Sequence, residues 1–147
     1  MIRWRSYVGS AVLVSAAFVA RTALDWLQPT SDFHLRSAVS TLSTAAIFTL
    51  VGSLAAWRSG TWIDGPVATF VTALLAALFS LAGVSALYAF RHDPATLDAM
   101  AGSGGLAEAL FLPVFLTLPA ALLGVLGGIC GAAARAVRGP AAPAHGS

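Results

Sequence analysis

The sequence predicts an all-α fold, an integral membrane four-helix bundle with short loops and both termini on one side of the membrane. Three observations predict it: four long apolar stretches, very few charges, and short connections between the stretches. The chain has 147 residues, of which 58% are hydrophobic and only 10% are charged. This is too little charge for the surface of a soluble domain. About 20 helical residues span a hydrocarbon core of about 30 Å, so each stretch is long enough to cross a bilayer.

The spans follow one another with little chain between them. They are Tyr7–Leu27, Ser37–Trp57, Pro66–Phe90 and Ala109–Ala134. The first span resembles a signal peptide, but Phe18 and Arg21 spoil the nearest cleavage sites, and we expect an uncleaved helix. We therefore predict one four-span transmembrane domain over residues 1–138. The tail 139–147 consists mostly of Pro, Ala and Gly and is expected to be disordered.

The connections carry signals for turns and helix caps. Asp64-Gly65-Pro66 ends a short loop and starts the third span. The longest connection, Arg91–Ala107, contains a predicted short helix. Asp93 would cap this helix, Pro94 would lie in its first turn, and Gly102 would end it.

Arginine placement predicts the orientation, because positive residues concentrate on the cytoplasmic side. With the N-terminus inside, five of the eight arginines are cytoplasmic: Arg3, Arg5, Arg58, Arg135 and Arg138. Both termini are then cytoplasmic. The abundance of alanine and arginine, without any lysine, suggests a GC-rich bacterial genome. We expect a multi-pass protein of the bacterial inner (plasma) membrane.

The fourth span carries the clearest packing motif. Its helix-packing candidates form two interlocked GxxxG patterns: Gly124, Gly127, Gly128 and Gly131. Small residues let helices approach closely in lipid, and we interpret this face as a contact within one chain or between chains. Close approach to a lipid or ligand is the alternative. Pro113 and Pro119 interrupt the same span and predict a kink, which is either a hinge or a bend that fits neighbouring helices.

Ionisable residues inside a membrane are the best sign of transport or catalysis, and the middles of all four spans contain none. This counts against a proton-coupled small multidrug-type transporter and against a haem-carrying bundle. Arg21 and Asp25, one helical turn apart near the outer end of the first span, are interpreted as an anchoring pair.

Polar residues outside the spans offer one weak metal hypothesis. His34 and His92 lie near Asp32 and Asp93, and a metal site would require these four groups, or Glu108, to converge. Their spacing does not demand convergence, and we predict solvated side chains and no metal. The single cysteine, Cys130, cannot form an internal disulfide. No catalytic motif and no basic stripe is present, so we predict no enzyme, no cofactor and no nucleic-acid partner.

Two segments carry a resemblance to a group of proteins. Gly52–Phe90, with its Trp57-Arg58-Ser59-Gly60 turn, and the ending Leu118–Arg135, with its glycine cluster, resemble small uncharacterised bacterial four-span membrane proteins with a Gly-rich last helix. The resemblance covers the last three spans. It implies a four-span fold, and because those proteins have no agreed activity it implies no catalytic residue.

The leading hypothesis is a non-enzymatic structural, assembly or interaction subunit whose helices associate through the Gly124–Gly131 face. Its partners would be the lipid bilayer and either a second copy of the chain or other membrane proteins. The alternative is a small transporter or channel subunit with a pathway lined by the Ser/Thr row of the second span, in which Ser40, Thr44 or Thr49 would be accessible to water. An enzyme would require the outer histidines and carboxylates to converge.

Overall fold

The computed structural model describes residues 4–28, 33–90, 93–102 and 105–138. These residues form six α-helices: α1 (Trp4–Leu27), α2 (Phe33–Ser59), α3 (Asp64–Phe90), α4 (Pro94–Gly102), α5 (Gly105–Phe115) and α6 (Thr117–Arg138). Four segments are long and apolar enough to cross a membrane: Val8–Leu27, His34–Ser59, Asp64–Phe90 and Leu110–Arg138. The all-α fold class is therefore confirmed. The predicted tail lies outside the described residues.

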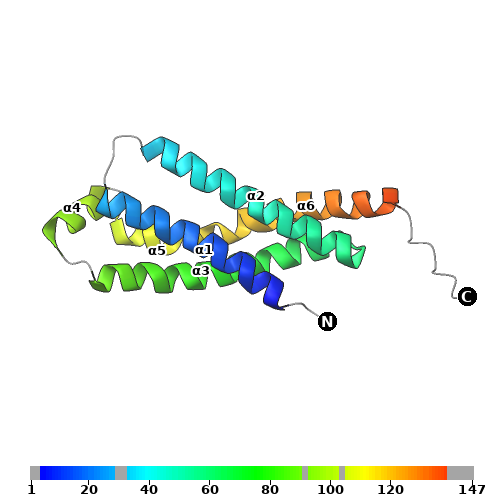
Figure 1. Cartoon of the computed structure of the whole chain (residues 1–147), viewed down its shortest axis with the longest axis horizontal. Coiled ribbons are helices and arrows are strands. Elements are labelled where there is room, and N and C mark those ends of the chain that lie inside the picture. The colour runs from blue at the N-terminus through cyan, green and yellow to red at the C-terminus, as the bar shows by residue number, and fades with distance from the viewer. Residues whose placement is uncertain (1–3, 29–32, 91–92, 103–104, 139–147) are drawn as a thin grey trace, which may run out of the picture.

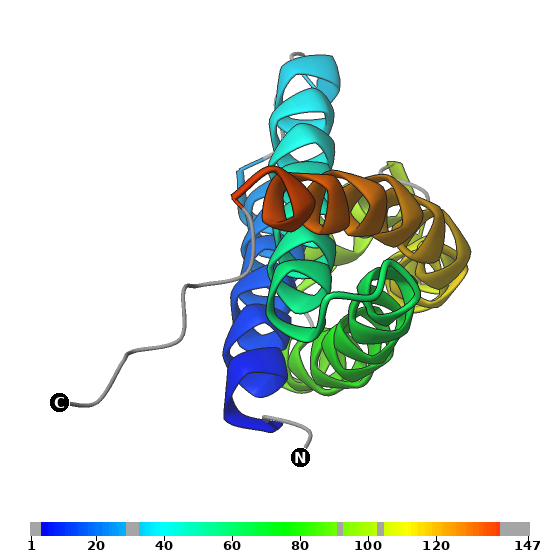
Figure 2. The ribbon, with the colours of Figure 1, turned by 90° about the vertical axis from the view of Figure 1, so that its right-hand side faces the viewer.

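The helices pack along the long axis of the molecule (Figure 1). α6 lies against α2 and α3, whereas α1 lies against α3 and, less extensively, against α2. The short helix α4 sits at one end, where it contacts α1 and α5. The opposite side of the bundle holds the N-termini of α1 and α3 and the C-termini of α2 and α6. This side faces the viewer in Figure 2.

α3 is the most buried of the four spans. Its buried residues are glycine, alanine or other small and β-branched residues: Gly65, Ala68, Thr69, Thr72, Ala73, Ala76, Ala77, Ser80 and Val84. Helices with such faces approach closely and gain van der Waals contact along their length. The alanine-rich sequence of α3 thus makes it the central helix, which contacts α1, α2, α5 and α6.

Large apolar side chains point away from this core. Leu42, Leu118 and Leu122 are each about 70% exposed (70%, 71% and 70%). A soluble bundle would bury such leucines, and an apolar surface of this extent indicates contact with lipid. Small residues inside and large apolar residues outside are the arrangement expected when the bilayer is the solvent. The chain is therefore a multi-pass membrane protein that associates with a lipid bilayer.

The predicted short helix in the longest connection is confirmed as α4. Asp93 caps it: one carboxylate oxygen accepts a hydrogen bond from the Thr96 backbone N–H at 3.0 Å, and the other accepts one from the Thr96 hydroxyl at 2.8 Å. Pro94 is the first helical residue and Gly102 the last. Because the cap satisfies the first turn, α4 can form without a long apolar face.

Candidate functional site

The four glycines singled out in the fourth span are all buried on α6. Each faces a neighbouring segment so closely that a Cβ atom would collide with it. At Gly124 the Cβ would lie 2.6 Å from Thr69 Oγ1 and 2.8 Å from Pro66 Cα. At Gly127 it would meet Thr49 O and lie 2.9 Å from Ser53 N.

The other two glycines meet backbone as well. A Cβ on Gly128 would meet the Trp62 carbonyl oxygen, and one on Gly131 would meet the backbone of Ser53. The glycine row therefore lies in the angle between α2 and α3, and α6 contacts both helices through it. Only hydrogen at these four Cα positions allows this approach.

Two further glycines belong to the same junction, and sequence reasoning did not include them. A Cβ on Gly65 would lie 2.6 Å from Gly124 O and from Gly128 Cα. A Cβ on Gly52 would lie 2.9 Å from Gly124 O. In the sequence, Gly65 belongs to the Asp64-Gly65-Pro66 motif, which predicts only the end of a loop and the start of a helix. Its burial on the inner face of α3 could not be inferred from that motif.

The fourth span is divided in two at Leu116, between α5 and α6. Pro113 lies inside α5, and Pro119 is the third residue of α6. Proline lacks an N–H, so neither can complete the regular ladder of hydrogen bonds. Ladder bonds remain beside the break, from Leu116 N to Leu112 O and from Ala120 N to Leu116 O, both at 3.0 Å. Whether the break acts as a hinge stays a prediction.

The hydroxyl-bearing residues of α2 differ in burial: Thr44 is buried and Ser40 is half-buried. Thr41 is exposed, whereas Ser37, Thr49 and Ser53 are half-buried. Thr49 donates to the Ala45 carbonyl oxygen at 2.9 Å, one turn back in the same helix. Such bonds satisfy the hydroxyl locally and do not require a polar pathway.

Fully buried hydroxyls lie instead on α3. Thr69, Thr72 and Ser80 are each 0% exposed. Thr69 Oγ1 donates to Gly65 O at 2.9 Å and lies 3.4 Å from Phe48 O. Within the described part of the chain, Thr72 Oγ1 and Ser80 Oγ have no hydrogen-bond partner. In the sequence, Thr72 and Ser80 belong to a row of small residues, and that pattern does not distinguish a buried hydroxyl from a packing position.

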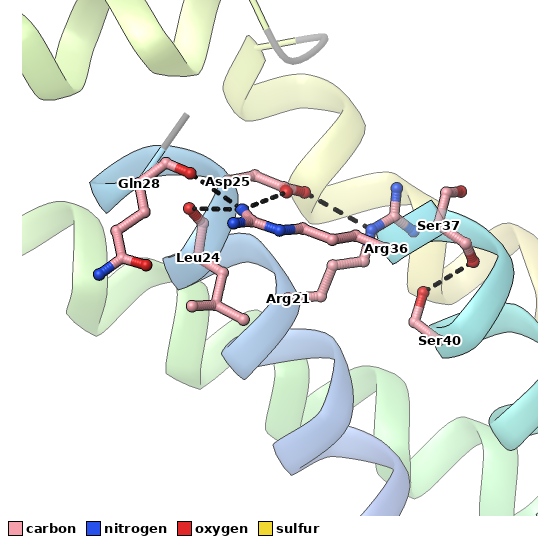
Figure 3. Close-up of polar contacts among 7 residues, drawn as sticks. All are labelled: Arg21, Leu24, Asp25, Gln28, Arg36, Ser37 and Ser40. Carbon is pink, nitrogen blue, oxygen red and sulfur yellow. Dashed lines mark hydrogen bonds and ion pairs between the residues drawn. The ribbon is translucent and has the colours of Figure 1, made fainter. Parts of the chain in front are cut away.

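Charged side chains join α1 to α2 at the end of the bundle that carries α4. Arg21 Nε lies 3.6 Å from Asp25 Oδ2, which confirms the predicted pair. Arg36 Nη1 lies 3.7 Å from Asp25 Oδ1, so two arginines approach one carboxylate (Figure 3). Arg36 Nη1 also donates to the carbonyl oxygens of Leu24, at 3.2 Å, and Gln28, at 2.9 Å. It thereby caps the C-terminus of α1, where carbonyls lack partners within the helix.

A second arginine cap lies at the opposite end. Arg135 Nη1, near the end of α6, donates to Trp57 O at 3.0 Å and to Arg58 O at 2.8 Å. Arg138 Cζ lies 4.7 Å from the centre of the Trp57 ring, within the range of a cation–π contact. Gly60, with φ 84°, ends α2 beside the Arg135 guanidinium, where a side chain would be strained.

The metal hypothesis gains no support from the described residues. His34 is exposed, and the Asp93 carboxylate caps α4. Among the residues whose side chains are described, no three His, Cys, Asp or Glu lie close enough to hold a metal ion. His92, Asp32 and the Glu108 side chain fall outside this set. Cys130 is exposed on the surface of α6.

Comparison with known proteins adds no family to this description. No family model matches the sequence, and no curated protein and no solved structure matches it. The fold and the outward-facing leucines define the class, a small multi-pass membrane protein with four candidate spans. The resemblance to bacterial four-span proteins holds only at this level.

Proposed function

We propose that the chain is a non-enzymatic multi-pass protein of the bacterial inner membrane, and that it acts as a structural, assembly or interaction subunit. The observation that carries the proposal is the close backbone contact that fixes α6 between α2 and α3. We call this contact the glycine junction, and its glycines are Gly52, Gly65, Gly124, Gly127, Gly128 and Gly131. Such packing supports a rigid scaffold in lipid, because it gains contact without any charged group in the membrane.

The same contacts favour packing within one chain over association between copies. The sequence hypothesis assigns the Gly124–Gly131 face to association between copies as well as to packing within a chain. In the structure, α2 and α3 of the same chain cover all four glycines. A second copy cannot occupy this face while the bundle is closed, so a partner would use another surface. Gly128→Leu should accordingly lower the thermal stability of the bundle. Loss of self-association with unchanged stability would contradict this assignment.

The surface that best fits a partner is the N-terminal half of α2. Thr41 and Ser43 are exposed there, beside Leu42. Hydroxyls on a lipid-exposed helix gain from hydrogen bonds to another membrane helix. Photo-reactive residues placed at Thr41 and Ser43 should form protein adducts in native membranes. The same residue at Leu122, an exposed position on α6, serves as the control and should react with lipid only. Absence of protein adducts at both α2 positions would contradict an interaction subunit.

A small transporter or channel subunit is the second candidate. The buried hydroxyls of Thr72 and Ser80 on α3 and of Thr44 on α2 favour it, because they place polar atoms inside the bundle. The original hypothesis places the pathway along α2, and Ser40, Thr44 and Thr49 test it. Each should be changed to cysteine in a Cys130→Ala background, because Cys130 is itself exposed. Labelling by a water-soluble thiol reagent would support a pathway, and complete protection of all three would contradict it.

A further inference from the structure

The two ends of the bundle differ in how their arginines are balanced. At the end opposite α4, the arginines whose side chains are described are Arg58, Arg135 and Arg138, and all three are exposed. Within the described residues none of them forms an ion pair with a carboxylate. The nearby Asp64 carboxylate accepts a hydrogen bond from the Thr61 hydroxyl at 3.0 Å. Among the described side chains, this end therefore carries more positive than negative charge.

At the end near α4 the situation is reversed. Asp25 lies between Arg21 and Arg36 there, and the side chains of Arg21 and Asp25 are 13% and 10% exposed. Arg36 is directed further to the carbonyl oxygens at the end of α1, which carry the negative end of the helix dipole. The protein itself thus supplies the counter-charge for these arginines.

The unbalanced arginines are organised around the end of α2. Arg135 Nη1 is fixed by the carbonyls of Trp57 and Arg58, and Arg138 stacks over the Trp57 ring. Tryptophan marks the level of the lipid headgroups in membrane proteins. Exposed apolar residues adjoin the cluster, namely Leu54, 51% exposed, and Val137, 88% exposed.

We propose that this cluster, defined by Trp57, Arg58, Arg135 and Arg138, binds the headgroup of an anionic phospholipid. The planar guanidinium group matches a phosphate through paired hydrogen bonds, and it remains charged while stacked on an indole ring. Trp57 holds the cluster at headgroup depth, and Leu54 and Val137 offer apolar surface to the acyl chains. The lipid supplies a counter-charge for these arginines, none of which forms an ion pair with a described carboxylate.

The test measures retention of lipid by the full-length protein in a neutral detergent, by native mass spectrometry. Phosphatidylglycerol is the anionic probe, and phosphatidylcholine is the control with a phosphate but no net charge. Arg58→Gln and Arg138→Gln should each weaken phosphatidylglycerol binding about fivefold, and the double variant about 25-fold. Arg135 is left intact because it caps α2. The double lysine variant, Arg58→Lys with Arg138→Lys, keeps the charge and should retain most of the binding.

Arg91→Gln is the matched charge control, because it removes one positive charge from the connection that follows α3. Equal loss of binding in Arg91→Gln would overturn the proposal, since the effect would then follow net charge. Equal retention of phosphatidylcholine, or unchanged binding in the glutamine double variant, would also overturn it. Displacement of the lipid by millimolar inorganic phosphate would assign the cluster to free phosphate instead.

Discussion

A few glycines, which have no Cβ atom, allow α6 to approach α2 and α3 closely. The backbone of α6 approaches the backbone of neighbouring segments at four glycines: Gly124, Gly127, Gly128 and Gly131. Gly65 contributes to the same contact from α3. The glycine cluster was visible in the sequence, but its partners were not. A GxxxG pattern specifies a face that can be approached closely, and it does not say whether the approaching helix comes from the same chain.

Gly127→Ala should destabilise the bundle by about 1–3 kcal/mol, because overpacking displaces one helix from another. The added methyl group would meet Thr49 O and Ser53 N, which are backbone atoms of α2 and cannot rotate away. Unfolding by SDS titration would measure the loss. Gly9→Ala is the control, since no atom lies within 4 Å of its Cβ position, and it should not lower stability. Equal effects of the two variants would contradict the glycine junction.

Thr69 and Thr72 should respond in opposite directions to the same substitution. Thr69→Val removes a hydroxyl bonded to Gly65 O and should cost about 0.6 kcal/mol. Thr72→Val removes a buried hydroxyl without a described partner and should stabilise by about 1 kcal/mol. Both are nearly isosteric, so packing changes little. The free energy of unfolding in detergent gives the comparison, and a loss at Thr72 as large as at Thr69 would indicate that its hydroxyl is bonded.

At the level of the helices, two arginines cap the C-termini of α1 and α2. Arg36 lies in the first turn of α2, the next helix along the chain, and caps α1, whereas Arg135 lies 77 residues from Arg58 and caps α2. The first contact could have been predicted, because a short connection brings the end of one span near the start of the next. The second could not, because it requires α6 to lie beside α2.

Arg36→Gln should lower the melting temperature of the bundle, with a cost of about 1 kcal/mol from the hydrogen bonds to the α1 carbonyls. It also leaves Asp25 with a single arginine. Asp98→Asn, a charge-removing change at an exposed position on α4, is the control and should have little effect. Thermal unfolding followed by circular dichroism compares the two. Equal melting temperatures would show that the Arg36 cap contributes nothing measurable.

We expect the break in the fourth span to depend on its two prolines. Replacing Pro113 and Pro119 together by alanine restores two backbone donors and removes the steric conflict with the preceding turn. Spin labels at Phe111 and Leu126, both 59% exposed, would report the change by pulsed electron resonance. The distance should lengthen toward the roughly 22 Å that 15 residues span in a continuous helix. An unchanged distance would assign the bend to packing against neighbouring helices.

At the level of the whole molecule, the arrangement of residues is the reverse of a soluble bundle. α3 buries small residues at the centre, and leucines of α2 and α6 face outward. We propose that the arginine cluster of α2 and α6 faces the cytoplasm and that α4 faces the outside, following the positive-inside rule.

This orientation predicts the accessibility of cysteines in whole cells. Asp98→Cys, in a Cys130→Ala background, should be labelled by a thiol reagent that cannot cross the membrane. Ser59→Cys, exposed at the other end of the bundle, should be protected until the cells are opened. The reverse pattern would place both termini outside.

The sequence by itself determined the four apolar spans, the capped helix α4, the Arg21–Asp25 pair and the membrane as the solvent. These depend on local features: hydropathy over about 20 residues, a cap and proline in one turn, and a spacing of four on a helix. The tertiary structure decided which segments face the glycines, which hydroxyls of α3 are fully buried, and which helix ends the arginines cap. These contacts join residues far apart in the chain, and abundant small residues are compatible with several packings. Only the packing of α6 between α2 and α3 selects one of them.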